Sequence, residues 1–300
     1  MHGRIKLFWI GLAVIAFAGG CNPFWPEPEP EAPDSAVAEI VKLGTKFDAS
    51  TTGTIRGKVT WQGNLPEIPK HIAYQAKMLF QPPWTVNSKE FSDPHIPRIS
   101  EPHKAMADVV VYLRNVDPKK SKPWTLPPVR VELSESKIDV IQGDKHKRTA
   151  FVRKGENITF DSREDRYHVA RAEGAAFFSL PLPKPNQPRT RLLNQTGRVE
   201  LTNGAGYYWT RGHIFVTEHP YIVHTNKQGE FVLDQVPPGR YELVVWVPNW
   251  HIARREYDTE SLVTSRLYYC DPVEVTQTLT ITEKQSANVN INISKDMFGK

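Results

Sequence analysis

The chain of 300 residues carries 38 Lys and Arg against 33 Asp and Glu, a formal net charge of +5. Acidic residues are interspersed with the basic ones, so the sequence lacks a basic stripe and no nucleic-acid partner is expected. Its two cysteines cannot build the disulfide framework of a small secreted domain.

The first twenty residues have the three parts of a secretory signal peptide. Positive charges at Arg4 and Lys6 precede an apolar run over residues 7–18, and small residues follow it. The run is too short to span a bilayer, which needs about 20 apolar residues. Two glycines directly before Cys21 resemble the bacterial lipobox, which implies that residues 1–20 are removed and that the Cys21 thiol is acylated. The alternative is a plain secretory signal followed by an unrelated cysteine.

The segment after Cys21 predicts a solvated tether. Residues 22–31 are rich in alternating Pro and Glu, which cannot bury a core. A short helix is expected over residues 35–44, and the tether region as a whole spans residues 21–52. Removal of the signal leaves a net charge of +3. We therefore expect a protein of the cell envelope, anchored to a membrane by lipid and facing the periplasm or the exterior.

Beyond the tether, strand signals recur between turn residues. Apolar and polar residues alternate in many of them, which is the period of a half-buried strand, and no long helical period is present. This pattern predicts an all-β sandwich protein, with the Pro-rich stretches at residues 66–102 and 180–188 as loops or edge excursions. The expected strands span residues 54–61, 109–113, 129–133, 137–141, 149–152, 157–161, 167–171, 198–202, 213–217, 221–225, 230–233, 240–247, 271–275 and 286–293.

Two segments resemble the carboxypeptidase regulatory-like (transthyretin-like) module. Residues 53–63 have the Gly-x-Ile-x-Gly-x-Val pattern of its opening strand, and residues 224–243 resemble its most diagnostic stretch. In that stretch a turn at residues 226–229 precedes Phe231 and Leu233, which are expected to point inward. The resemblance implies a sandwich built from residues 53–127 and 218–300.

The intervening residues 128–217 resemble a cupredoxin. The resemblance rests on the strands near residues 129–133 and 151–160, on residues 166–169, and on residues 206–216 around Trp209. It implies two associated β-sandwiches, with a cupredoxin-like sandwich inserted into the regulatory-like module.

The copper ligands of a cupredoxin are missing from the matching positions. A blue-copper site needs two imidazoles and a thiolate, usually with an axial thioether. The first imidazole maps to His168. Alignment on Trp209 places Tyr207 at the second histidine, Thr210 at the methionine, and Gly204 or Asn203 at the cysteine; residues 22–269 contain no cysteine. The resemblance therefore implies that the fold was kept and the copper lost, and no cofactor is expected.

A different metal site remains an alternative. His168, His213 and His219 are candidate ligands, although residues 213 and 219 of one extended strand would lie about 20 Å apart and need a turn to converge. The competing interpretation is scattered surface or loop histidines.

Tryptophans suggest a third possibility. Trp250 follows Pro248 and Asn249 in an expected loop, where an exposed ring could stack on a sugar, whereas Trp246 lies in an expected strand and is assigned to the core. Packing or strand-end capping is the competing interpretation for both.

No local motif of an enzyme is present: the sequence has no nucleophile elbow, no phosphate-binding glycine loop and no zinc-protease helix motif. The hypothesis is thus a lipid-anchored, non-enzymatic cell-envelope protein with a binding or scaffolding role. Its expected partners are the membrane and an envelope protein or glycan. A metal-binding or redox cupredoxin-like protein and a carbohydrate-binding module are the alternatives.

Overall fold

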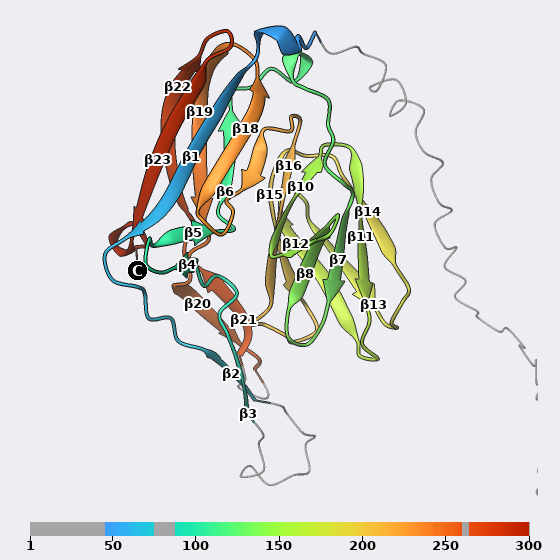
Figure 1. Ribbon diagram of the computed structural model, residues 1–300. Coiled ribbons are helices and arrows are strands. Elements are labelled where there is room, and N and C mark those ends of the chain that lie inside the picture. Colours follow the sequence, from blue (N-terminus) through green and yellow to red (C-terminus); the bar gives the residue numbers. More distant parts are fainter. Residues whose placement is uncertain (1–45, 75–87, 260–263, 300) are drawn as a thin grey trace, which may run out of the picture. The chain divides into compact units, whose positions relative to one another are not determined.

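A computed structural model describes residues 46–74, 88–259 and 264–299 (Figure 1). The predicted signal peptide, Cys21, the Pro/Glu tether and the short helix lie outside these residues. The described chain is all-β, which confirms the predicted fold class, with short 3₁₀ turns η1 (Ala49–Thr51), η3 (Pro118–Lys120) and η4 (Lys295–Met297). Across these ranges, no helix has the length and apolar character needed to cross a membrane.

The first sandwich consists of two sheets around one apolar core. Residues that alternate along its strands, such as Ile55 and Val59, or Phe231 and Leu233, are buried in this core. One sheet contains β18 (Glu230–Val236), β1 (Gly53–Gln62), β5 (Ala105–Ala107), β4 (Arg98–Ser100) and β23 (Ser286–Ser294), and the other contains β17 (Ile222–His224), β6 (Val110–Arg114), β19 (Gly239–Val247) and β22 (Val273–Ile281).

The inserted sandwich lies between β6 and β17 in the sequence and has its own core, formed largely by Val, Ile, Leu and Ala side chains. One sheet has the order β10 (Thr149–Arg153), β16 (Arg211–Thr217), β15 (Gly197–Asn203), β12 (His168–Gly174), β13 (Phe178–Leu182), and the other has the order β14 (Arg189–Leu193), β11 (Glu156–Ser162), β7 (Val129–Leu133), β8 (Ile138–Gln142), β9 (Lys145–Lys147). Strands β10 and β16 are parallel, as are β7 and β11, while the other pairings are antiparallel.

Both Pro-rich stretches, expected as loops or edge excursions, contain short strands, and β13 and β4 (Arg98–Ser100) are edges of their sheets. β13 includes Pro181, which pairs with Val169 of β12, and β13 is the edge of its sheet. Proline is tolerated there because an edge strand has one side without a ladder partner for its missing N–H. The first stretch likewise contains β2 (His71–Tyr74), β3 (Ser88–Phe91) and β4.

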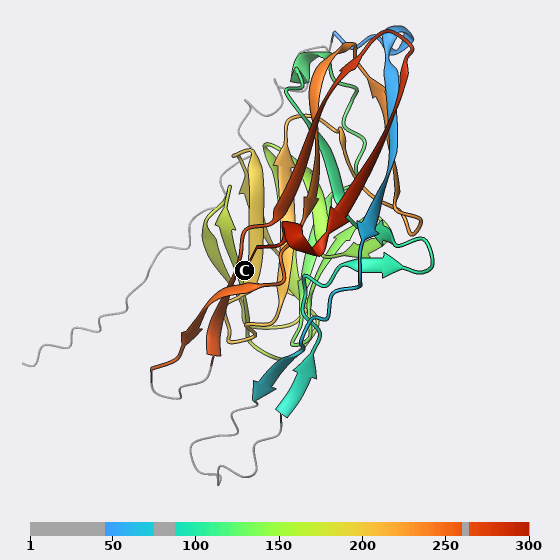
Figure 2. The ribbon, with the colours of Figure 1, turned by 90° about the vertical axis from the view of Figure 1, so that its left-hand side faces the viewer.

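Two hairpins project from the first sandwich, at the lower side of the view in Figure 2. One pairs β2 with β3, and the other pairs β20 (Ile252–Tyr257) with β21 (Thr264–Tyr269). Phe91 and Leu267 from these hairpins pack with Tyr208 and Trp209 of the inserted sandwich. Through these contacts, the two hairpins of the first sandwich pack against one end of the inserted sandwich.

A small aromatic cluster joins the two sandwiches. Val110, Ile222 and Trp246 of the first sandwich pack against Phe151 and Phe215 of the inserted sandwich, and the Trp246 and Phe215 ring centroids are 5.1 Å apart. We call this contact the seam. Because side chains alternate along a strand, β16 directs Ile214 and Val216 into its own core and Phe215 into the seam.

Candidate functional site

His213 lies on β16 at the edge of the seam. It shares the outward face of the strand with Phe215, and its ring meets Trp246 edge-on with 5.0 Å between centroids. Only 2% of the residue is exposed. The strand alternation thus places an imidazole where the first sandwich covers it.

His95 reaches the same place from the loop between β3 and β4. The Asp93 carboxylate accepts a hydrogen bond from the His95 backbone N–H at 2.7 Å, a local turn of the kind Asp favours. The His95 ring packs on Tyr269, and its Nδ1 is 2.7 Å from the carbonyl oxygen of Asn249. A carbonyl only accepts, so Nδ1 carries the proton and Nε2 keeps its lone pair.

The two imidazoles face each other. Their Nε2 atoms are 3.2 Å apart, and His95 is 5% exposed. Burial lowers the pKa of His95 to about 4, with Arg211 and Arg148 acting in the same direction, and burial also lowers the pKa of His213 well below its usual range. Both rings are therefore neutral at pH 7, so no charge repulsion between them destabilises the contact.

The protons of this pair leave one nitrogen without a partner. His95 Nε2 can only accept, so His213 Nε2–H donates to it and the proton is absent from His213 Nδ1. That Nδ1 is buried and finds no protein partner among the described residues. A buried polar atom left unsatisfied costs about 1–3 kcal/mol.

A second buried network fixes Asp93. Its other carboxylate oxygen lies 2.9 Å from His71 Nε2 and 3.3 Å from the Tyr269 hydroxyl. Burial, and next the Asp93 charge, raise the pKa of Tyr269, so the hydroxyl keeps its proton. Asp93 is thus held from both sides and in turn positions the backbone of His95.

Arginines surround the pair. Arg211 is 2% exposed, donates to the carbonyl oxygens of Tyr208, Thr210 and Leu267, and lies near the Glu200 carboxylate. Arg148 donates to the carbonyl oxygens of Asp93 and Pro94 and has no ion pair in the part of the chain described. Burial lowers its pKa, and Arg98 acts in the same direction.

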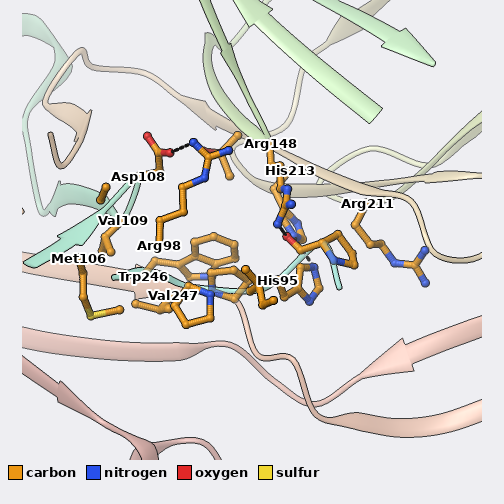
Figure 3. A pocket seen from close by; sticks show the side chains of 16 residues that line it. His95, Arg98, Met106, Asp108, Val109, Arg148, Arg211, His213, Trp246 and Val247 are labelled. Carbon is orange, nitrogen blue, oxygen red and sulfur yellow. Dashed lines mark hydrogen bonds and ion pairs between the residues drawn. The ribbon is translucent and has the colours of Figure 1, made fainter. Parts of the chain in front are cut away.

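Cavities lie on two sides of the histidine pair. Figure 3 shows the first, of about 60 Å³, with His95 and His213 at one end and Arg98, Asp108 and Trp246 around it. The second has a volume of about 130 Å³. Both histidines line it, together with Arg198, Glu200, Tyr269, Cys270 and four neighbouring loop residues. Cavities of this size accommodate an ion or a few waters, which need about 10–15 Å³ each.

His168 is buried on β12 and does not pair with this arrangement, because Glu173, not His168, is level with His213 in the register of the sheet. Asn203 Nδ2–H donates to His168 Nδ1 at 2.8 Å, and the Tyr207 ring lies 5.1 Å from the imidazole. Trp209 is stacked on Phe91 at 4.5 Å nearby. An amide, a phenol ring and apolar packing replace the thiolate and second imidazole, so these residues do not fit a blue-copper ion.

His219 does not join His168 and His213. It lies after β16, packs on Tyr221, and has a buried Nδ1 without a partner among the described residues. No group of three or more His, Cys, Asp or Glu side chains with metal-binding geometry occurs within residues 46–74, 88–259 and 264–299. The three candidate histidines therefore do not form one site in this part of the chain, and His213 meets His95 instead. His95 lies in a Pro-rich stretch that carries no local metal signature, so the sequence did not single it out.

Trp250 requires a correction. It is in a loop as predicted, but only 5% of it is exposed, because Trp61 and Phe298 cover its ring with centroids 6.2 and 4.1 Å away. A sugar cannot stack on a ring that the core already covers, so Trp250 is a core residue. Trp246 is 1% exposed, as expected for a core strand position.

Comparison with known proteins identifies similar folds only. No protein-family model matches the chain, and no curated protein matches it significantly. Among solved structures, an oxidised amicyanin mutant is 18% identical over 30% of this chain and 82% of its own, with a TM-score of 0.24. A reduced amicyanin mutant is 13% identical over 35% and 99%, with a TM-score of 0.24. A purple cupredoxin from Nitrosopumilus maritimus is 12% identical over 23% and 77%, with a TM-score of 0.21.

Proposed function

We propose that this chain is a lipid-anchored, non-enzymatic protein of the cell envelope that binds a small ligand where its two sandwiches meet. The observation that carries the proposal is the buried polar group beside the seam. His95 and His213 face each other, His213 Nδ1 has no partner among the described residues, and Arg148 has no carboxylate partner there.

The cost of this arrangement supports a binding role. Burying polar and charged groups without full compensation is unfavourable, and well-packed apolar residues in their place are often neutral or stabilising. The neighbouring aromatic cluster already joins the sandwiches through apolar contact. The histidines and arginines are therefore not needed to hold the two sandwiches together. A bound ligand would supply the partners that these buried polar groups lack.

The anchor is supported by the sequence before the described residues. Positive charge, a short apolar run and two glycines precede Cys21, and the acidic, Pro-rich segment that follows would hold the sandwiches away from a membrane. Of the alternatives, the glycan-binding module is not supported, because its candidate residue Trp250 is buried in the core. The metal-binding alternative loses its candidate ligands, because His168, His213 and His219 do not come together in the described residues.

The test uses the full chain, expressed with its own leader in a Gram-negative bacterium. We expect it in the membrane fraction with an acyl mass on Cys21, and we expect Cys21→Ala to lose that mass. Native mass spectrometry of the detergent-extracted protein should show a non-covalent ligand that is missing in His213→Gln but present in the matched variant His219→Gln. An unacylated wild-type chain would overturn the anchor. A folded wild-type chain with no bound mass would overturn the binding role.

A further inference from the structure

We propose that the cavity in Figure 3 binds a small organic monocarboxylate, with its carboxylate on the Arg148 guanidinium and a short apolar tail against the opposite wall. This inference rests on the proposed function, because it names the chemical class of the ligand at the same seam. The hydrogen bond between His95 and His213 stays intact in the bound state.

Arg148 lines this cavity and keeps one edge of its guanidinium unpaired. Its Nη1 donates to the carbonyl oxygens of Asp93 and Pro94. Its Nε–H and the two N–H groups of Nη2 have no protein partner among the described residues, and neither nitrogen is fully buried. Two neighbouring guanidinium nitrogens form the fork that binds a carboxylate through two parallel hydrogen bonds. Arg148 therefore has an unused carboxylate-binding edge.

The bonds at Nη1 hold this guanidinium in place before any ligand arrives. Arg148 directly precedes β10 of the inserted sandwich, whereas Asp93 and Pro94 belong to the loop between β3 and β4. A side chain that is already fixed loses little rotamer freedom when it binds a ligand, so more of the interaction energy appears as affinity. The site is thus formed in advance, from both sides of the seam.

The charges around the cavity leave one positive charge in excess. Three cations and two carboxylates lie beside it: Arg98, Lys147, Arg148, Asp93 and Asp108. Asp108 is shared between Arg98, 2.7 Å away, and Lys147. Burial lowers the pKa of Arg148, which means that its charged form is poorly solvated. One negative charge would balance it, whereas a dianion would leave a net negative charge in a partly buried site.

Arg211 does not alter this balance. It also lines the cavity, but its guanidinium donates to the Leu267 carbonyl oxygen at 2.6 Å and lies 3.1 Å from the Glu200 carboxylate. Figure 3 shows this guanidinium directed away from the other labelled side chains. Among the described residues that line the cavity, Arg148 is therefore the arginine without a carboxylate partner.

The rest of the wall is mostly apolar, and it limits the size of the ligand. Among the residues that line it are Ile96, Met106, Val109, Trp246 and Val247. A cavity of about 60 Å³ has room for about four to six waters. Sulfate would lose its hydration against these side chains without replacement hydrogen bonds, whereas an aliphatic tail gains from the same contact. A carboxylate with a tail of about one to three carbons fits both the volume and the wall.

The experiment titrates the full-length, detergent-extracted protein with acetate, propionate or butyrate at pH 7 in chloride-free buffer. Calorimetry measures binding, and the thermal midpoint gives a second readout. Propionamide, which has the same shape without the charge, is the matched control ligand, and sulfate tests a dianion. We expect about one propionate per chain, a raised midpoint, and affinity that increases by up to about fourfold for each methylene that fits. Propionamide and sulfate should not bind.

Variants of Arg148 test the carboxylate end of the site. Arg148→Gln should weaken propionate binding at least about tenfold, because it removes the charge-assisted hydrogen bonds. Arg148→Lys keeps the charge but not the fork, so it should weaken binding less. His213→Gln alters the wall at one end of the cavity and should weaken binding as well. The matched control is Arg163→Gln, an exposed arginine paired with Glu132, which should bind as the wild type does.

Circular dichroism checks that each variant folds, and the comparison of propionate with propionamide tests the site on the wild type alone. Equal binding of propionate and propionamide, or unchanged propionate binding in folded Arg148→Gln, would overturn the site. A neutral or cationic ligand found by native mass spectrometry, with no propionate uptake, would overturn this inference and leave the binding role intact. No bound mass and no propionate uptake would overturn both. Loss of acylation at Cys21 would affect the anchor alone.

Discussion

Two buried histidines of the same sheet differ in the groups that their ring nitrogens face. His168 on β12 accepts a hydrogen bond from Asn203 at Nδ1, and its Nε2 lies 3.3 Å from the Glu164 carboxylate without a hydrogen bond. His213 on β16 faces the Nε2 of another imidazole with its own Nε2, and its Nδ1 has no partner among the described residues. Burial is therefore a poor guide to function for histidine, and what each ring nitrogen faces is a better one.

The end of the inserted sandwich around His168 should behave as core. Trp209 is 9% exposed, stacks on Phe91 and donates its indole N–H to the Glu135 carbonyl oxygen at 2.7 Å. Trp209→Ala should cost about 3–5 kcal/mol of unfolding free energy, the largest effect expected here. Chemical denaturation measures it. The control is Phe177→Ala, at an 82% exposed position, which should stay within about 0.5 kcal/mol. A cost for Trp209→Ala no larger than that control would show that this end is not packed as core.

Acid should destabilise the protein through neutral histidines that are partly buried. Burial lowers the pKa of His219 to about 4 and that of His224 to about 3, from a usual value of 6.5. A lowered histidine pKa means that the unfolded chain binds protons first, so stability is full above about pH 6.5 and falls as the pH decreases toward 4. The loss is at most about 1.4 kcal/mol per pH unit per histidine.

The matched variant is His219→Gln, which cannot titrate. Between pH 6.5 and 4 it should lose less stability than the wild type, by up to about 3 kcal/mol. Urea denaturation at several pH values measures this difference. Identical pH profiles for the two proteins would show that His219 is protonated equally in the folded and unfolded chains.

Replacing each histidine by leucine tests these contacts. His168→Leu removes the acceptor of the buried Asn203 amide, and His213→Leu removes the donor to the buried His95 Nε2. Each variant leaves one buried polar atom without a partner, so each should cost about 1–3 kcal/mol of unfolding free energy. Parallel chemical denaturation of the two variants measures both costs. A cost within about 0.5 kcal/mol of zero for either variant would show that its hydrogen bond does not stabilise the fold.

Short-range sequence patterns predict much of the fold. The alternation of Val289, Ile291 and Ile293 predicts one buried face, and all three are buried on β23. The turn predicted at residues 226–229 is present, with the Asn226 side chain accepting from the backbone N–H groups of Gln228 and Glu230. Gly229 has φ +76°, which glycine adopts without strain. These features follow from neighbours in the sequence, which is why the sequence predicts them.

Loop position misled the prediction for Trp250, where tertiary neighbours decide. Pro181, by contrast, lies in the edge strand β13, as the expected edge excursion of that Pro-rich stretch predicts. Trp250 is in a loop, yet Trp61 and Phe298, far away in the sequence, cover it. The absence of a thiolate and second imidazole around His168, by contrast, was readable from residue identities alone.

The sequence by itself determined the all-β class, most strand positions and the unsuitability of the His168 surroundings for blue copper, because these depend on local alternation and on residue type. Only the tertiary structure decided that His95 meets His213. The two are 118 residues apart, in different sandwiches, and lie in a loop without strand periodicity and in an ordinary strand. Their approach depends on the packing of one sandwich against the other, and no short-range pattern in either segment encodes it.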